Sequence, residues 1–102
     1  MALRFEFADP GLEALYIVQA DARRYSAAVV RRFFLVVHAI EGAADERDFY
    51  KLKSFHFDEL EGKHEKLSHR SMRLNDQYRL IVMLEDRAEG RIVVIHAIED
   101  YH

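Results

Sequence analysis

Cysteine is absent from the 102-residue sequence, proline occurs once and glycine four times. Without cysteine, disulfides, thiolate nucleophiles and cysteine-based zinc sites are excluded. No run approaches the ~18 apolar residues that a membrane span needs. Charged residues stand at Arg4, Glu6 and Asp9, where a signal peptide would be apolar. The sequence therefore predicts a cytoplasmic protein with no membrane segment.

The composition is that of one compact domain covering residues 1–102. Half of the residues are hydrophobic and 32% are charged, which is typical of a folded chain and unlike a disordered tail. A chain of this length buries roughly two thirds of its unfolded surface, enough for one core. We expect a single domain without repeats.

The net charge of −3 argues at first against a nucleic-acid partner, because phosphate-binding proteins usually carry a basic surplus. The charge is unevenly distributed, however. Residues 51–84 contain seven basic and five acidic side chains, whereas the flanking segments are both net acidic. This middle segment is either a solvated charged face or a site for a polyanion.

The first half of the sequence predicts a strand and two helices. Phe5 and Phe7 alternate with charged residues, as in a half-buried strand. Asp9-Pro10 is typical of a helix start, because Asp caps free N–H groups and Pro tolerates the first helical position. A second helix is predicted from Ser26 to Gly42, with a stripe of apolar residues that we interpret as core: Val29, Val30, Phe33, Phe34, Val37 and Ile40.

The second half predicts a largely antiparallel sheet. Residues 44–48 are interpreted as a linker, residues 55–60 as a short extended piece and residues 62–68 as a polar loop. Strands are expected at 71–74, 78–84 and 92–98, the last two joined by a hairpin connection over 85–90. The predicted fold class is α+β: an N-terminal strand, two helices and about four strands, with the helices packed on the sheet.

The sequence gives little support for a metal site, a cofactor site or a hydrolase triad. His64 and His69 are five residues apart, whereas a helical zinc pair needs a spacing of four. The scattered glycines form no phosphate-binding loop. No nucleophile elbow surrounds Ser54 or Ser71, which argues against a triad with His102. We expect neither a metal nor another cofactor.

Two arginines stand out in the segment 70–79. The strand period places Arg73 on the face opposite Met72 and Leu74, and Asn75-Asp76 is typical of a tight turn before the next strand. Arg79 then begins that strand beside apolar neighbours. These arginines are either ordinary surface charges or a pair presented to a ligand.

The segment Asp100-Tyr101-His102 places three proton-active groups after a predicted buried strand. Imidazole titrates near neutral pH, and a neighbouring carboxylate favours its protonated form. We expect His102 to be capable of acid catalysis.

The two motifs together, residues 71–79 and 100–102, resemble the HigB branch of the RelE/ParE toxin superfamily, with Leu60-Glu61-Gly62 as a weaker landmark between the helices and the motifs. The resemblance extends from residue 3 to residue 102. It implies a microbial-RNase-like fold and a ribosome-dependent endoribonuclease that cuts mRNA and inhibits translation. It also implies a helix-turn-helix, HigA-like antitoxin, through which alone operator DNA is contacted.

The resemblance also implies roles for individual residues. Arg73 and Arg79 are expected to stabilise the phosphate, His102 to act as acid or base, Tyr101 to stack or transfer a proton, and Asp100 to hold the histidine. Metal-free cleavage through the ribose 2′-OH needs these groups, and only RNA has that nucleophile. Expected RNA-binding residues are Lys63, Lys66, His69, Asn75 and Gln77.

Two departures from the family pattern leave an alternative open. Asp58 and Glu61 are acidic where relatives carry a histidine and a lysine, and a carboxylate repels phosphate. The alternative is a non-catalytic or attenuated toxin-fold protein that acts by binding, as a gyrase poison or as the partner of an antitoxin repressor.

Overall fold

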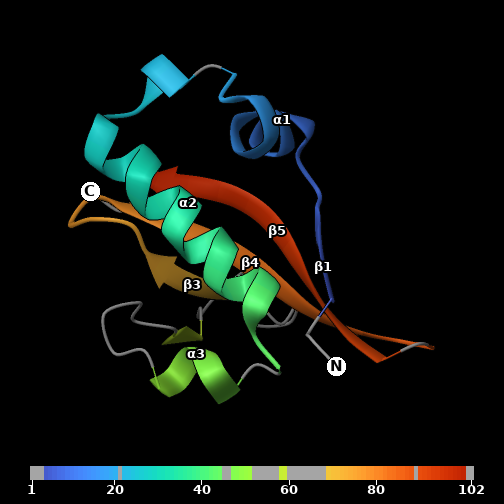
Figure 1. The fold of residues 1–102 in the computed structure, drawn as a ribbon. Helices are drawn as coiled ribbons and strands as arrows, with labels where there is room; N and C mark the ends of the chain where they lie inside the picture. The colour runs from blue at the N-terminus through green and yellow to red at the C-terminus, as the bar shows by residue number, and fades with distance from the viewer. Residues whose placement is uncertain are drawn as a thin grey trace.

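The computed structural model describes residues 4–20, 22–44, 47–51, 58–59, 69–88 and 90–100. Figure 1 shows the order of the elements along the chain. They are β1 (Arg4–Phe7), α1 (Pro10–Val18), the 3₁₀ turn η1 (Ala22–Arg24), α2 (Ala27–Gly42), α3 (Arg47–Lys51), β2 (Asp58–Glu59), β3 (His69–Arg73), β4 (Tyr78–Arg87) and β5 (Gly90–Asp100).

The strands form one mixed sheet in the order β1-β5-β4-β3-β2. Strand β1 runs parallel to β5, and the other neighbouring strands pair antiparallel. The predicted α+β class and the predicted order of an N-terminal strand, helices and then strands are confirmed. None of the helices in the described ranges is long and apolar enough to span a membrane.

Both long helices begin where the sequence predicts. The carboxylate of Asp9 accepts a hydrogen bond of 2.8 Å from the backbone N–H of Gly11, with Pro10 in the first helical position. The hydroxyl of Ser26 accepts one of 3.2 Å from the N–H of Val29, and α2 ends at Gly42. These caps satisfy N–H groups that have no partner within the first turn of a helix.

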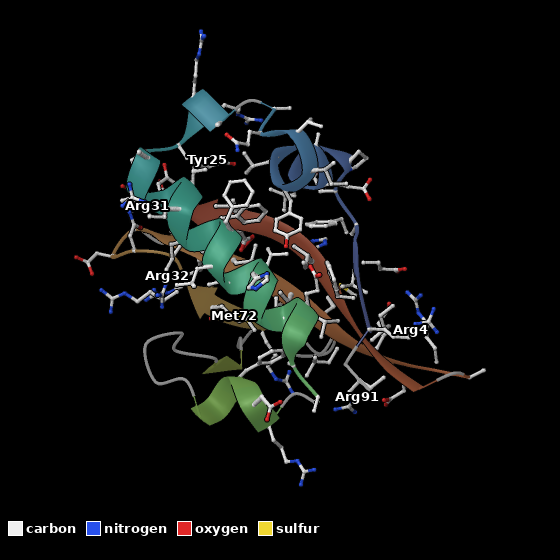
Figure 2. The ribbon with its side chains drawn as sticks, viewed as in Figure 1. Arg4, Tyr25, Arg31, Arg32, Met72 and Arg91 are labelled. Carbon is white, nitrogen blue, oxygen red and sulfur yellow. The ribbon has the colours of Figure 1, made fainter. Side chains whose placement is uncertain are left out.

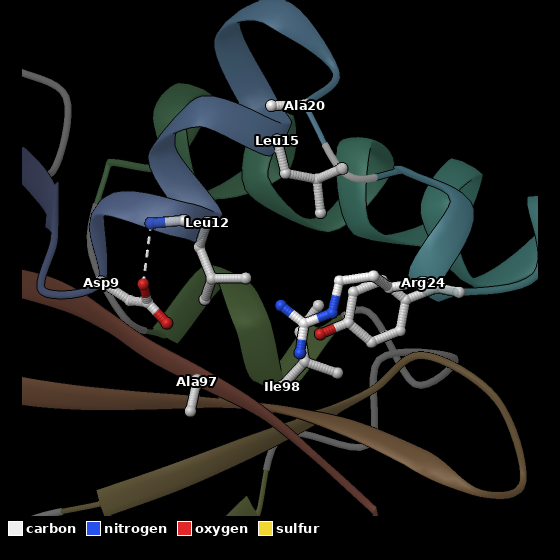
Figure 3. A pocket seen from close by; sticks show the side chains of 9 residues that line it. Asp9, Leu12, Leu15, Ala20, Arg24, Ala97 and Ile98 are labelled. Carbon is white, nitrogen blue, oxygen red and sulfur yellow. Dashed lines mark hydrogen bonds between the residues drawn. The ribbon is translucent and has the colours of Figure 1, made fainter.

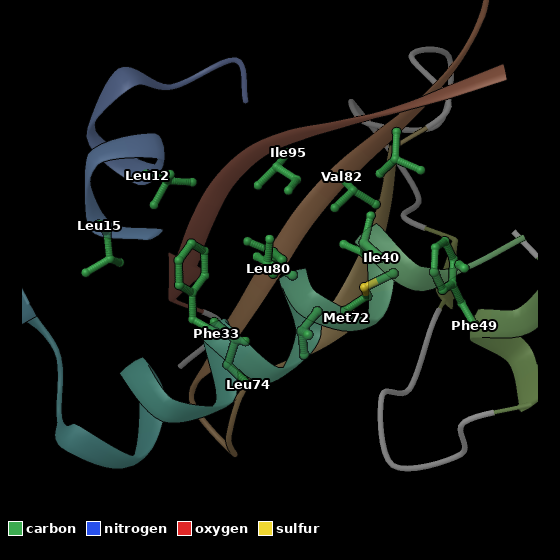
Figure 4. Close-up of a cluster of buried hydrophobic side chains, with 14 of the residues drawn as sticks. Leu12, Leu15, Phe33, Ile40, Phe49, Met72, Leu74, Leu80, Val82 and Ile95 are labelled. Carbon is green, nitrogen blue, oxygen red and sulfur yellow. The ribbon is translucent and has the colours of Figure 1, made fainter. Parts of the chain in front are cut away.

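The core lies between α1, α2 and one face of the sheet (Figure 4). Phe33 and Ile40 of α2 are fully buried, as are Leu80 and Val82 of β4. Each large side chain buried in this way contributes roughly 1.5–3 kcal/mol of transfer free energy. Further members of the core are Leu12, Leu15, Val29, Val36, Val37, Phe49, Met72, Leu74, Leu84, Val93 and Ile95. The predicted core role is confirmed for four residues of the α2 stripe, Val29, Phe33, Val37 and Ile40. It is wrong for Val30 and Phe34, which are only partly buried and line a groove on the surface.

Two predicted connections are wrong in part. The linker predicted over 44–48 ends in a helix, because α3 begins at Arg47 and Phe49 is drawn into the core. The hairpin connection predicted over 85–90 is mostly strand, and only residues 88–89 lie between β4 and β5. The charges in that segment support the strands: Arg91 forms an ion pair of 2.9 Å with Asp86, which is its cross-strand partner.

The pairing of β4 with β5 contains a β-bulge. Ile81 is opposite Ala97 and Val82 is opposite Ile95, so His96 is an extra residue on β5. Because side chains alternate between the two faces of a strand, one extra residue exchanges the faces of everything that follows it. The bulge thereby puts Asp100 on the same face as Tyr78 and Glu99 on the same face as Arg79.

Candidate functional site

The turn between β3 and β4 is held by one side chain. The Oδ1 atom of Asn75 accepts hydrogen bonds from the backbone N–H of Gln77, at 2.9 Å, and of Tyr78, at 2.6 Å. The backbone N–H of Leu74 also donates to the carbonyl of Tyr78 at 3.0 Å. The turn predicted at Asn75-Asp76 is confirmed, and its mechanism is the ability of Asn to satisfy backbone donors two and three residues ahead.

This turn brings Arg73 and Arg79 together. The two residues are direct cross-strand partners on β3 and β4, and Glu99 of β5 is the partner of Arg79 on its other side. The three side chains form a row on the face opposite α1 and α2, since the alternate residues Met72 and Leu80 belong to the core. We call these three residues the arginine row.

The arginine row borders an apolar area. Ile81 follows Arg79 on the same face of β4 and is fully buried, as is Leu80 on the other face. Like charges directly opposite each other on a sheet repel, and apolar surroundings screen that repulsion less than water does. Asp76 and Glu99 already offset part of this repulsion, and the two adjacent guanidinium groups still offer several N–H donors to a phosphate.

The arginines are held by specific partners. Arg73 forms an ion pair with Asp76, whose side chain is 90% exposed. The Nη1 atom of Arg79 donates a hydrogen bond of 3.3 Å to the carbonyl oxygen of Asn75. From α2, the Nε atom of Arg32 reaches the carbonyl oxygen of Arg73 at 3.5 Å. The turn and the helix therefore both fix the end of β3.

A second group lies at the same end of the sheet, on the other face. Gln77 donates a hydrogen bond of 3.0 Å from Nε2 to Oδ2 of Asp100, and Asp100 is the cross-strand partner of Tyr78. The ring of Tyr78 packs edge-on against Tyr25, with 5.8 Å between ring centroids. The two motifs singled out in the sequence thus meet in space.

Some predicted site residues cannot be placed. Lys63, Lys66, Tyr101 and His102 lie outside the described residues. The backbone of His69 is in β3 opposite Met83. Their expected roles remain predictions, as do those of Arg73, Arg79, Asp100, Asn75 and Gln77.

Three contributors were missed by the sequence analysis. Arg32 lies on a helix that was interpreted only as core, and no pattern signals its contact with the end of β3. Asp76 was interpreted only as a turn residue, although its position three residues after Arg73 allows the ion pair. Tyr25 precedes α2, and its contact with Tyr78 bridges 53 positions along the sequence.

A small cavity of about 220 Å³ lies between α1 and the end of β5, and Ala97 and Ile98 line its sheet side (Figure 3). Arg24 and Tyr25 also line it, so Tyr25 connects the cavity to Tyr78. Among the residues that the structure describes, no three histidine, cysteine, aspartate or glutamate side chains are grouped in a way that would hold a metal ion.

Comparison with known proteins agrees with this geometry. Residues 5–102 match the family model described as "RelE-like toxin of type II toxin-antitoxin system HigB". The fold is similar to that of a YoeB/ParE toxin from Agrobacterium tumefaciens, with a TM-score of 0.53, 12% identity and 100% of each chain covered. No curated protein sequence matches. Since the family model spans nearly the whole sequence, the chain belongs to the HigB-like, RelE-like toxins of type II toxin-antitoxin systems.

Proposed function

We propose that this toxin is a ribosome-dependent mRNA endonuclease. The observation that carries the proposal is the cross-strand pair of Arg73 and Arg79 beside the contact of Gln77 with Asp100. Such a pair of guanidinium groups matches a phosphodiester that gains negative charge during cleavage. Membership of the HigB-like family supports the same activity.

The proposed reaction uses the RNA's own nucleophile. A base removes the proton of the ribose 2′-OH, and the 2′-oxygen forms a bond to the adjacent phosphorus. The bond from phosphorus to the 5′-oxygen of the next nucleotide then breaks, and an acid protonates that oxygen. Arg73 and Arg79 stabilise the added charge on the phosphate, and His102 serves as acid or base. Tyr101 stacks on the RNA or transfers a proton.

Gln77 and Asp100 are positioning residues in this account. The amide of Gln77 donates to one carboxylate oxygen of Asp100 and so fixes the last described residue of β5. Asp100 in turn orients His102. Asn75 holds Arg79 through its backbone carbonyl, whereas its side chain holds the turn. Lys63, Lys66 and His69 add RNA contacts.

The ribosome is required because binding to free RNA is weak. The chain has a net charge of −3, and Asp76 competes with a phosphate for Arg73. A ribosome that presents the message supplies the positioning that the toxin's own charges do not. We further propose a cytoplasmic toxin whose antitoxin is a helix-turn-helix, HigA-like protein that alone contacts operator DNA.

Primer extension of a message in a translating extract tests the proposal. We expect new 5′ ends with the wild-type chain and at least about a hundredfold fewer with Arg79→Ala or His102→Ala, since each removes a group that acts in the transition state. Arg91→Ala is the matched control, because Arg91 is an exposed arginine at the opposite end of β5. Undiminished cleavage by Arg79→Ala would refute the proposed role of the row.

The ion pair between Asp76 and Arg73 also favours a second candidate, an attenuated toxin that acts by binding. Asp58 and Glu61 also favour this candidate, because both are acidic where relatives carry cationic groups. Such a protein would poison gyrase or serve only as partner of the antitoxin repressor. Cleaved DNA–gyrase complexes together with intact mRNA would identify a gyrase poison. Normal repression of the operon, with neither cleaved mRNA nor cleaved DNA–gyrase complexes, would identify a partner of the antitoxin repressor.

A further inference from the structure

A second basic segment lies far from the motifs of the candidate site. From residue 22 to residue 40 the sequence contains four arginines and no acidic residue: Arg23, Arg24, Arg31 and Arg32. Arg32 is directed to the end of β3. Within the described ranges, Arg23 and Arg31 take part in no ion pair. Among the residues that the structure describes, the helical layer of this net acidic protein thus carries two arginines that are not neutralised by an ion pair.

These two cations flank an apolar groove. The groove has a volume of about 460 Å³ and lies where η1 meets the first half of α2. Arg23 lines it from η1 and Arg31 from α2, and Figure 2 shows Arg31 beside this part of α2. The remaining lining is apolar or aromatic: Ala22, Tyr25, Ala27, Val30 and Phe34.

The apolar surface continues beyond the groove along α2. Leu35, one helical turn after Arg31, is 51% exposed and so adds apolar surface next to the groove. Apolar surface rimmed by charge is typical of protein interaction sites. The groove and Leu35 together form two adjacent apolar contact sites for a helix of a partner protein.

We infer that this groove is the docking site for the antitoxin, and that it takes an amphipathic segment in which acidic side chains flank an apolar anchor. The apolar anchor enters between Val30 and Phe34, and carboxylates of the antitoxin pair with Arg23 and Arg31. The inference rests on the family, which implies an antitoxin partner, and does not require that the toxin be a nuclease.

Charge and packing disfavour the other occupants. A second copy of the chain docked through the same groove would bring Arg23 and Arg31 of both copies together across a two-fold axis. Proteins that hold single-stranded RNA commonly stack its bases on aromatic faces. Phe34 already packs against Tyr16 and Phe33, with ring centroids 5.6 Å and 5.9 Å away, so its ring is committed to the protein.

Two pairs of neighbouring residues provide matched tests. Ala27 lines the groove and Ala28 does not, yet both are exposed in the first turn of α2, where a glutamate has the same favourable effect on the helix. Arg23 lines the groove, whereas Arg24 lines the cavity between α1 and β5. Each pair separates the groove from general effects of charge on folding.

The experiment measures the affinity of the full chain for the purified product of the adjoining antitoxin gene. We expect Ala27→Glu and Arg23→Glu to weaken binding by about tenfold or more, because each opposes an acidic partner. Ala28→Glu and Arg24→Glu should leave the affinity within about twofold of wild type, and all four variants should keep a cooperative thermal transition.

Salt supplies a second readout. Raising ionic strength from about 0.1 M to 1 M shortens the Debye length from about 10 Å to 3 Å, so wild-type affinity should fall and that of Arg23→Glu should change less. Equal affinities for Ala27→Glu and Ala28→Glu would overturn the inference. So would self-association or RNA binding that Ala27→Glu abolishes while antitoxin affinity is unchanged. Because binding is measured, loss of the proposed nuclease function leaves the test intact.

Discussion

Gln77 and Asp100 are 23 residues apart in the sequence and are joined by a hydrogen bond of 3.0 Å. The contact depends on two structural details: the Asn75 turn, which starts β4 at Tyr78, and the bulge at His96, which turns Asp100 toward the face of Tyr78. One hydrogen bond therefore couples the arginine motif to the end of β5.

Replacing Gln77 tests that coupling. Gln77→Leu removes the donor to Asp100, and Gln77→Glu also places a second carboxylate beside it. We expect cleavage on the ribosome to fall by about tenfold in the first variant and further in the second, with a stability change below about 1 kcal/mol because the bond is exposed. Single-turnover rates measure the effect. A Gln77→Glu variant as active as wild type would contradict the positioning role.

Asp76 is expected to restrain the toxin. Asp76→Asn removes the ion-pair partner of Arg73 and leaves the turn residue similar in shape, so affinity for the message should rise severalfold. Asp86→Asn is the matched control, because it makes the same change of charge at a second exposed ion pair. The gain should vanish in the Arg73→Ala background. An equal gain in both single variants would show that only net charge matters.

Asn75 is expected to act through the fold of the turn. Asn75→Ala loses an acceptor for two backbone N–H groups and should lower the free energy of unfolding by about 1 to 2 kcal/mol. Asn75→Asp keeps that acceptor and should preserve stability and most of the cleavage. Urea unfolding of both variants checks the first effect. If Asn75→Asp is stable but inactive, holding the turn is not the whole role of Asn75, and the loss comes either from the added negative charge or from a lost contact of the amide with RNA, as the sequence analysis predicted.

The stability of the fold should depend on pH through the ion pair between Glu6 of β1 and Arg87 of β4. The hydrogen bond of 2.6 Å from Arg87 to Glu6 holds the pKa of this carboxyl below its ordinary value. A lowered folded pKa gives stability that is present above about pH 4.3 and is lost as the pH falls through the folded pKa. The excess of wild type over Glu6→Gln in urea midpoint should be full at pH 6 and should shrink as the pH falls through the lowered pKa of Glu6. A difference that persists at acid pH would contradict this assignment.

Local signals in the sequence were sufficient for α1, α2 and the order of the strands, whereas α3 was missed. The caps at Asp9 and Ser26 act within three residues, so the sequence contains all the information needed to predict them. The bulge at His96 could not be predicted in this way, because it depends on the pairing of β5 with β4. The sequence also predicted a loop where β4 ends and β5 begins, because this segment is rich in charged residues. The ion pair between Asp86 and Arg91 that stabilises it forms only when the two strands pair.

The site was predictable as a set of residue types and not as an arrangement. The sequence singled out Arg73 and Arg79, and the register of β3 with β4 made them direct neighbours. Their partners Asp76 and Arg32 were missed because a turn acid and a helical arginine carry no distinctive pattern. The basic groove on the helical layer was missed because the charges were counted over three long segments. The first of these segments is net acidic although it contains Arg23 and Arg31.

The most direct test of the account is to replace a single ribose at the cleaved position of a ribosome-bound message by 2′-deoxyribose. Cleavage through the 2′-OH predicts that the wild-type toxin leaves this message intact at that position and still cuts the all-RNA message there, leaving a 2′,3′-cyclic phosphate. Cutting of the deoxy-substituted message at the same position would contradict the account, as would an all-RNA message that stays intact.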